Sequence, residues 1–440
     1  MNLLLITFSF PPAGGVGVLR ALSLAKYLPE NGIRVDVLTA RNAPAVGKDL
    51  SLLQQVPAEV QVHRTWTLDL PFWLRKSVKK AVTGGKGKPA TASSQPSSKK
   101  GNPIKQWIGN LLLPDPQIGW LPFAAPAAAR IIRQRSIDAV LITVPPYSSV
   151  KLVTRLRRLF PDLPIVLDFR DEWLSTTIDL VSFNNNTRAR MIAQTTEREG
   201  VRDATAVVMV TEAARRELQA RYPDVPAEKF LCINNGYDLA PPTEQTYSSP
   251  APSKQVVLTY IGTVYGSTAP GTFVEAVRGL PAEIRSRLRV RYIGHIESPA
   301  YREQLLSLGE TVELKGFMPQ AEALAAIRST DYLLLITHDR INVAAKFYDY
   351  LGGGKPILAA VHPDGDVRRL LEETHSGRWA DVADPQAIRR MLEEAVISGA
   401  FAKPDFGRIA AYHRRPLTAQ YAAVLKRVAE GKRHRREVSA

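Results

Sequence analysis

The sequence predicts an α/β protein of two domains, each with a parallel sheet covered by helices. Short β-branched runs alternate with amphipathic stretches, which is typical of parallel strands joined by crossover helices. This alternation begins afresh in the second half of the chain. The length agrees, because 440 residues exceed what one hydrophobic core usually serves, and 45% apolar residues can fill two cores.

In the first half, several expected strands are apolar at consecutive positions, as in strands covered on both faces. They are Leu3–Phe8, Arg34–Thr39, Val60–Thr65, Ile137–Thr143, Ile165–Asp168, Ala206–Val210 and Phe230–Ile233. A helix is expected over residues 15–31, which keep apolar side chains at helical spacing and precede Gly32.

Residues 239–254 hold four prolines with several Ser and Thr and are expected to be an interdomain linker. They separate an N-terminal domain (1–238) from a C-terminal domain (255–407), which are followed by a helix at 408–430 and a basic tail at 431–440. The second series of expected strands is Val256–Ile261, Leu288–Ile293, Val312–Lys315, Asp331–Ile336 and Pro356–Ala360, with helices at Gln320–Arg328 and Ala344–Leu351.

Most of the net charge of +16 comes from one segment, about 75–105, which carries nine basic residues and no acid. Residues 72–82 combine apolar and lysine faces at helical spacing, which predicts either an interfacial membrane helix or a solvated charged helix. Residues 84–102 are expected to be a disordered loop. No nucleic-acid recognition motif accompanies the charge. The candidate membrane contacts are Trp73, Leu74, Lys76, Lys79 and Lys80.

The remaining composition favours a cytoplasmic protein. The single cysteine, Cys232, excludes an internal disulfide framework and fits a reducing compartment. The first apolar run has no basic residue before it and continues into Pro11-Pro12, so we expect a buried strand and not a secretion signal. No segment holds the ~20 uninterrupted apolar residues of a spanning helix; prolines interrupt the closest, residues 107–132.

The first motif that carries chemistry is Phe10–Gly17, between the first strand and the first helix. Its glycines let the backbone approach a ligand, and the helix N-terminus beyond offers N–H groups for a diphosphate. The alternative is that Gly14-Gly15 only packs the helix on the strand.

The second motif is formed by Thr143–Ser148 and Leu167–Trp173, which follow strands at their carboxyl ends, where open α/β sheets bind ligands. Asp168, Arg170 and Asp171 place charges at this edge. Either Asp171 faces a ligand, or an Arg–Asp pair braces the loop.

The third motif is Ala345–Leu358, a helix that begins with Lys346, carries Asp349 one turn later and ends on glycines before a buried strand. A lysine at a helix start does not suit the helix dipole, whereas an anionic ligand there would explain it. The alternative is a surface Lys–Asp pair with i,i+3 spacing.

Taken in order, these motifs resemble glycosyltransferase family 4, in the branch found in bacterial polysaccharide and glycolipid assembly. The resemblance covers nearly the whole chain, and the ordered set is what makes it specific. The matching segments are Phe10–Gly15, Pro114–Trp120, Pro145–Ser148, Asp168–Trp173, Asn235–Asp238, Tyr260–Tyr265 and Gly316–Pro319.

The resemblance implies the GT-B architecture, in which two Rossmann-like domains face a cleft. The N-terminal domain would bind a glycan or lipid-linked acceptor, and the C-terminal domain a nucleotide-sugar donor. The last helix would cross back to the N-terminal domain. Transfer would retain the anomeric configuration without a metal or other cofactor. Separately from the resemblance, Trp73, Leu74 and the lysines of the basic segment predict peripheral attachment of the protein to the anionic inner face of the membrane.

Carried over residue by residue, the resemblance assigns catalytic roles to Asp171 and Lys346. Lys346 would neutralise the leaving phosphates, and Asp349 would hold the ribose. Tyr147 and Arg170 are expected on the acceptor side. The expected donor-binding residues are Gly14, Gly15, Gly262, Thr263, Lys346 and Asp349.

Two departures from the family pattern leave other functions open. Ile341 stands where many relatives carry the first of two acids, and the next basic residue after Gly262 is Arg278, too late for the usual Arg/Lys pair. The alternatives are a catalytically inactive scaffold at the membrane and a non-hydrolysing sugar-nucleotide epimerase. None of the seven histidines lies in the motifs.

Overall fold

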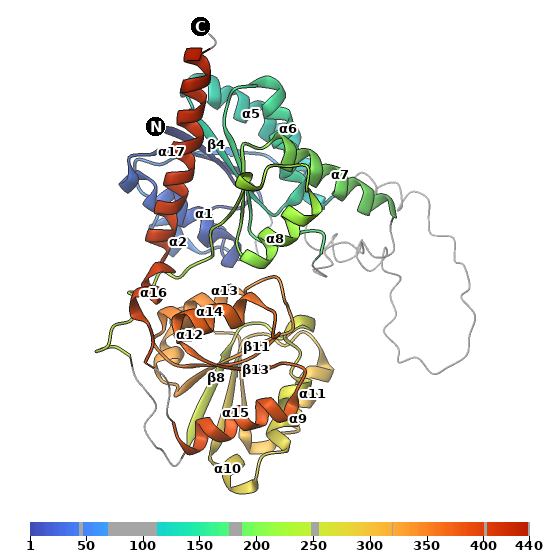
Figure 1. Cartoon of the computed structure of the whole chain (residues 1–440), viewed down its shortest axis with the longest axis vertical. Helices are drawn as coiled ribbons and strands as arrows, with labels where there is room; N and C mark the ends of the chain where they lie inside the picture. Colours follow the sequence, from blue (N-terminus) through green and yellow to red (C-terminus); the bar gives the residue numbers. More distant parts are fainter. Residues whose placement is uncertain are drawn as a thin grey trace, which may run out of the picture. The chain divides into compact units, whose positions relative to one another are not determined.

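The computed structural model describes residues 1–43, 47–68, 112–175, 187–247, 255–318, 320–399 and 403–438. The chain divides into two compact units. The N-terminal unit comprises Met1–Met209, Arg215–Cys232 and Thr418–Ala440, and the C-terminal unit comprises Val210–Ala214 and Ile233–Leu417. Each unit holds one sheet of parallel strands alternating with helices (Figure 1), which confirms the predicted fold class.

The N-terminal unit is built on a seven-stranded sheet in the order β3-β2-β1-β4-β5-β6-β7. The strand order reverses at β1, because the chain first adds strands on one side of it and then returns to add β4 on the other. The carboxyl ends of β1 and β4 therefore form a topological switch point, where open α/β sheets bind ligands. The strands are β1 (Asn2–Ile6), β2 (Arg34–Ala40), β3 (Gln61–Thr65), β4 (Ala139–Val144), β5 (Ile165–Phe169), β6 (Ala206–Met209) and β7 (Phe230–Cys232).

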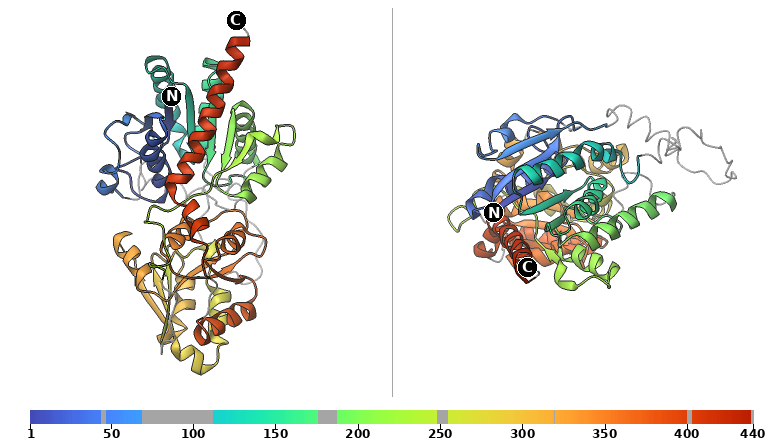
Figure 2. Two further views of the ribbon diagram at one scale, coloured as in Figure 1. Left: turned by 60° about the vertical axis from the view of Figure 1, so that its left-hand side comes forward. Right: turned by 90° about the horizontal axis from the view of Figure 1, so that it is seen from above.

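Helices cover both faces of this sheet. On one face α5, α6 and α7 pack in succession. Right-handed crossovers place α1 on the opposite face, where α17 lies beside it (Figure 1, Figure 2). The helices are α1 (Val16–Tyr27), α2 (Leu50–Leu53), α5 (Leu121–Gln134), α6 (Val150–Leu159), α7 (Thr187–Asp203), α8 (Glu212–Arg221) and α17 (Arg414–Val438).

Helix α5 begins within residues 107–132, the apolar segment in which prolines interrupt the run that a membrane-spanning helix needs. Pro122 occupies its first turn, where the missing N–H would have no partner inside the helix. Pro126 lies inside the helix but is exposed, while the alanines and isoleucines of the other side are buried. The prolines therefore sit on the solvent side of an apolar helix. No described helix combines the length and apolar character needed to cross a membrane.

The C-terminal unit has a six-stranded sheet in the order β10-β9-β8-β11-β12-β13. All pairs are parallel, and the order reverses between β8 and β11, which gives this unit a switch point of its own. The strands are β8 (Val256–Ile261), β9 (Leu288–Ile293), β10 (Val312–Gly316), β11 (Tyr332–Thr337), β12 (Ile357–Val361) and β13 (Gly377–Asp381).

Alternate residues of the central strands fill two cores, one on each face. Leu334 and Leu358 pack with α9 and α15, whereas Leu333 and Leu335 pack with α13 and α14. This period of two explains why β11 and β12 are buried at every position. The helices are α9 (Gly271–Arg278), α10 (Ala282–Arg287), α11 (Pro299–Leu306), α12 (Gln320–Arg328), α13 (Ala345–Gly352), α14 (Asp366–Thr374), α15 (Pro385–Ile397) and α16 (Phe406–Ala411).

The C-terminal helical region differs from the single helix expected at 408–430. It consists of α16 and α17, and α17 continues to Val438, through the basic residues expected to form a frayed tail. The division between the two units falls within α17, because its residues from Thr418 onward belong to the N-terminal unit.

Candidate functional site

The switch point of the C-terminal unit brings together three of the residues predicted to bind a donor. Gly262 and Thr263 directly follow β8, and Lys346 lies in the first turn of α13, which follows β11. A Cβ atom added to Gly262 would lie 3.4 Å from Cδ and 3.6 Å from Nζ of Lys346. The two chain segments are therefore in van der Waals contact at the edge where the topology predicts a ligand.

The ammonium group of Lys346 lies against an aromatic ring and not against a carboxylate. Its Nζ is 3.7 Å from the ring centroid of Tyr260. No ion pair with Asp349 occurs in the described part of the chain, so these two residues are not the surface pair considered above. Burial lowers the pKa of Lys346 to about 7. An anion bound beside this lysine would stabilise its charged form and raise its pKa again.

Asp349 lies one turn further along α13 and has a different environment. Burial raises its pKa to about 6, an effect that Arg414 opposes and Asp238 reinforces. No hydrogen bond to its half-buried carboxylate occurs among the described residues, so both of its oxygens remain available as acceptors.

Three neighbouring strands of this sheet end on glycines with positive φ, which we call the glycine ledge: Gly262 (128°), Gly294 (136°) and Gly316 (70°). They follow or end β8, β9 and β10, which are adjacent in the sheet. A Cβ atom on Gly294 would lie 2.2 Å from the carbonyl oxygen of Gly262, so no side chain fits there. The ledge therefore offers a ligand a floor of bare backbone.

An aromatic side chain stands at the far end of the ledge from Lys346. Phe317 directly follows Gly316 and is 85% exposed, the largest exposed fraction among the described bulky apolar residues. Two strand spacings, about 9.6 Å, separate β8 from β10. Neither Gly294 nor Phe317 was given a role from the sequence, although Phe317 lies in the matching segment Gly316–Pro319. The tripeptide Tyr-Ile-Gly also occurs twice, at Tyr260–Gly262 and Tyr292–Gly294.

The two glycines predicted in the N-terminal unit have different environments. The Gly14 N–H donates to the carbonyl of Gly47 at 2.9 Å, and a Cβ atom on Gly14 would touch that carbonyl at 3.3 Å. Gly15 is exposed, has a φ of 100°, caps α1 without a side-chain hydrogen bond and has nothing near its Cβ position. Gly14 thus packs against the loop that carries Gly47, while the backbone of Gly15 is exposed at the N-terminus of α1.

Arg170 acts as a brace between loops of the N-terminal unit. Its guanidinium donates to the carbonyls of Val144, Pro145 and Gly17, and burial lowers its pKa. An Arg–Asp pair that braces the loop was one alternative from the sequence, and the structure shows hydrogen bonds from Arg170 to three backbone carbonyls. Three of its donors are therefore committed within the protein.

Tyr147 and Asp171 lie together at the carboxyl ends of β4 and β5. The Tyr147 ring stacks on Trp173 with centroids 4.4 Å apart, and its hydroxyl donates to the Asp171 carbonyl at 3.4 Å. Burial, reinforced by Asp171 and Glu172, raises the pKa of Tyr147 well above its usual value. Asp171 itself is half-buried.

Two other motif residues have structural roles. Asp115 is buried and accepts hydrogen bonds from the backbone N–H and the hydroxyl of Ser148, both at 2.7 Å. Trp120 is fully buried and donates to Thr65 at 2.8 Å. Ile341 is also buried, with its carbonyl bonded to Thr211, so the position of the missing acid is part of the packed interior.

The predicted membrane contacts, Trp73, Leu74, Lys76, Lys79 and Lys80, lie outside the described residues, as does the basic segment 75–105. Among the residues that the structure does describe, no cluster of His, Cys, Asp and Glu has the arrangement of a metal site.

Residues 14–236 match the sequence model of the glycosyl transferase 4-like domain. No curated protein sequence matches the chain. The fold is similar to that of sucrose-phosphate synthase from Thermosynechococcus elongatus (14% identity, 98% of this chain and 99% of that chain, TM-score 0.62). It is also similar to Anabaena HepE in complex with UDP-glucose (15% identity, 98% of this chain and 99% of that chain, TM-score 0.54). A third similar fold is that of α,α-trehalose 6-phosphate synthase from Burkholderia multivorans (12% identity, 99% of this chain and 98% of that chain, TM-score 0.61). At these identities the likeness concerns the fold alone.

Proposed function

The chain belongs to the glycosyl transferase 4-like family, and from that premise we propose that it is a retaining glycosyltransferase that moves a sugar from a nucleotide-sugar to a glycan or lipid-linked acceptor. The observation that carries the proposal is the glycine ledge, with the ammonium of Lys346 at one end and the exposed ring of Phe317 at the other. Anabaena HepE, which has a similar fold, was solved with UDP-glucose.

In this proposal the donor diphosphate lies against Lys346 and the N-terminus of α13. No described side chain caps that helix, so the N–H groups of Ala345 and Lys346 are available to an anion, while that of Phe347 donates to the Ala344 carbonyl at 2.9 Å. The ribose crosses the bare backbone of the ledge, with Asp349 as the candidate acceptor for its hydroxyls. The base reaches Phe317. Gly15 in the N-terminal unit remains a predicted second diphosphate contact.

The proposed reaction does not require a general acid or base from the protein. The bond from the anomeric carbon to the diphosphate breaks, the acceptor oxygen bonds to that carbon on the same face, and the acceptor proton passes to the leaving diphosphate. Lys346 stabilises the departing charge, the kind of preorganised electrostatics that usually dominates catalysis. We keep Asp171 as the predicted catalytic residue of the N-terminal unit, and we propose that no metal takes part.

Product analysis separates this function from its alternatives. A retaining transferase gives a product with the anomeric configuration of the donor, which proton NMR reads directly. An epimerase converts the donor into its stereoisomer without any acceptor, and an inactive scaffold leaves the donor unchanged. Either of the last two results would replace the proposed function.

Replacing Phe317 with alanine is expected to weaken binding of a nucleoside diphosphate about tenfold, because stacking of a base on an aromatic ring contributes roughly 1–3 kcal/mol. Binding of inorganic pyrophosphate should not change, since it has no base. Calorimetric titration measures both. Ile397→Ala removes another exposed apolar side chain and is the matched control. Equal loss for both ligands would contradict the stacking role.

We also propose that the basic segment holds the protein on an anionic membrane surface, close to a lipid-linked acceptor. The nine basic residues and no acid in segment 75–105 support this, since each Lys or Arg near such a surface contributes about 1 kcal/mol. Deleting residues 72–102 is therefore expected to abolish sedimentation with vesicles containing phosphatidylserine. Undiminished sedimentation of the deletion variant would exclude the attachment.

A further inference from the structure

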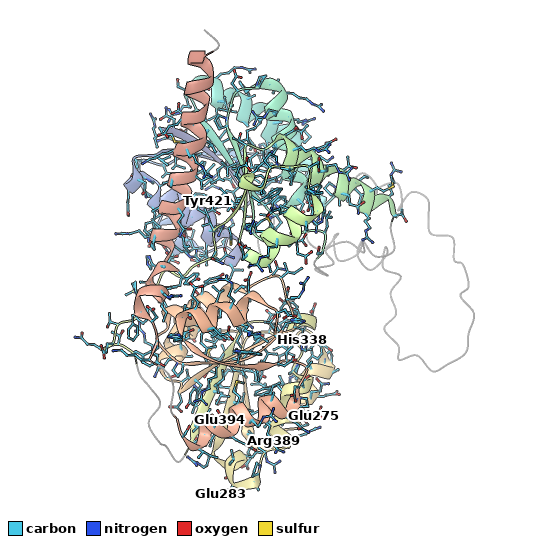
Figure 3. The ribbon with its side chains drawn as sticks, viewed as in Figure 1. Glu275, Glu283, His338, Arg389, Glu394 and Tyr421 are labelled. Atoms are coloured by element: carbon cyan, nitrogen blue, oxygen red, sulfur yellow. The ribbon has the colours of Figure 1, made fainter. Side chains whose placement is uncertain are left out.

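A buried cluster in the N-terminal unit joins the C-terminal helix to the loops at the switch point. Asp168 is completely buried, and Arg20 pairs with both of its oxygens, at 3.2 and 3.0 Å. The hydroxyl of Tyr421 donates to Asp168 Oδ1 at 2.6 Å and accepts a hydrogen bond from Arg20. Figure 3 labels Tyr421 on α17. The three residues come from β5, α1 and α17.

The Tyr421 hydroxyl is well matched to this position. The hydroxyl donates its proton to the Asp168 carboxylate, and its oxygen accepts from the Arg20 guanidinium. The Arg20 guanidinium carbon also lies 5.0 Å from the centroid of the Tyr421 ring. Arg20 and Tyr421 are nearly inaccessible to solvent, at 8% and 2% exposure. Water cannot readily substitute for a hydroxyl lost from this cluster, so its removal leaves buried charge incompletely bonded.

The cluster is continuous with the brace described above. Asp168 lies two residues before Arg170, whose guanidinium holds the carbonyls of Gly17, Val144 and Pro145. Arg20 lies one turn after Gly17 in α1. The two arginines thus fix the start of α1 and the carboxyl ends of β4 and β5 relative to one another. Gly15, Tyr147 and Asp171 are carried by those same segments.

We propose that Tyr421 is a positioning residue: acting through Asp168 and Arg20, it holds the loops that carry Gly15, Tyr147 and Asp171 in the arrangement needed for transfer. This inference rests on the proposed function and extends it to the C-terminal helix, which none of the motifs includes. The effect is expected on turnover and not on donor binding, because the glycine ledge and Lys346 belong to the other unit.

The test compares Tyr421→Phe with Tyr332→Phe, using UDP-glucose as the probe. Tyr332 is equally buried and donates its hydroxyl to the Ala395 carbonyl at 3.0 Å, at the amino end of β11, away from the ledge. In Tyr421→Phe we expect kcat for UDP-glucose turnover to fall about tenfold with KM unchanged, because small misplacements of catalytic groups strongly reduce rates. Tyr332→Phe should lower only the melting temperature.

Amide hydrogen exchange of the same two variants measures the stability of these loops without any ligand. Tyr421→Phe should speed amide exchange at least tenfold in residues 143–148 and 169–173, while Tyr332→Phe should not. If the wild-type protein does not turn over UDP-glucose, the proposed function fails for that donor, while exchange still decides the positioning. Unchanged exchange, or an unchanged kcat in an active protein, overturns the inference.

Discussion

Replacing Lys346 with alanine is expected to lower kcat/KM for the donor by about 10²–10³, the loss typical of removing one preorganised group that stabilises charge in the transition state. Lys346 lies beside Gly262 and against the Tyr260 ring, and no carboxylate of the described residues pairs with it, so no described neighbour replaces its charge. The melting temperature should hardly fall, because the substitution also removes a charge whose burial is unfavourable. Circular dichroism and steady-state kinetics measure the two effects separately.

The pKa of Lys346 adds a prediction with a definite sign. Burial lowers its pKa to about 7, so above that pH the free protein holds Lys346 mostly neutral. A bound diphosphate favours the charged form and raises the pKa again. Donor binding at pH 8 should therefore take up most of a proton, and affinity should fall as the pH rises through 7. Without ligand the sign is opposite: the folded state gains stability as the pH rises from about 7 toward the ordinary value of 10.5.

Calorimetry of UDP-glucose binding at pH 8, in two buffers with different ionisation enthalpies, counts the protons taken up. A nucleotide-sugar diphosphate has no group of its own that titrates near this pH, so the uptake reports the protein. Lys346→Arg is the control, because an arginine stays charged and should bind with no uptake. An uptake that persists in Lys346→Arg would assign the proton to another group.

The second large effect is expected for Gly294→Ala, which should destabilise the C-terminal unit by more than about 4 kcal/mol. The new Cβ would lie 2.2 Å from the Gly262 carbonyl oxygen, and that atom belongs to rigid backbone and not to a flexible side chain. Either the turn after β8 moves or the unit unfolds. Losses of this size are exceptional and arise from such specific causes.

Gly316→Ala provides the matched control. Gly316 also has a positive φ, of 70°, but nothing lies within 4 Å of its Cβ position. Its substitution should cost only the left-handed backbone term, roughly 1–2 kcal/mol. Thermal unfolding should show a decrease of about 10 °C or more for Gly294→Ala and a few degrees for Gly316→Ala. Equal decreases would mean that close approach of the two turns does not shape the ledge.

Most of the fold could be predicted because strands buried on both faces of a sheet appear in the sequence as short apolar runs. The apolar runs after residue 255 became β8, β9, β11 and β12 to within one or two residues. Two of the elements that were not placed from the sequence have identifiable reasons. Strand β13 (Gly377–Asp381) carries Arg and Asp at the edge of its sheet, and α5 was obscured by two prolines that lie in its first turn and on its solvent side.

The candidate site was predictable only in part. The place of Lys346 at a helix start pointed to an anion, and the structure brings it to Gly262 as the strand order requires. The sequence could not show that Arg170 would be engaged by backbone carbonyls, nor that Asp168 would be paired with Arg20 and Tyr421. Those contacts join residues up to 401 positions apart, and no local pattern encodes them.

The measurement that tests the central claim most directly is a thermal-shift titration of the full chain with UDP, GDP, ADP and their common sugar conjugates. A ligand that binds only the folded state raises the melting temperature by mass action, about 2.7 kcal/mol of stabilisation at one hundred times Kd. One base should give a clear increase, which should be much smaller in Lys346→Ala. No increase with any of these ligands, at millimolar concentration and pH 6.5 where Lys346 is charged, would contradict a nucleotide site on the glycine ledge.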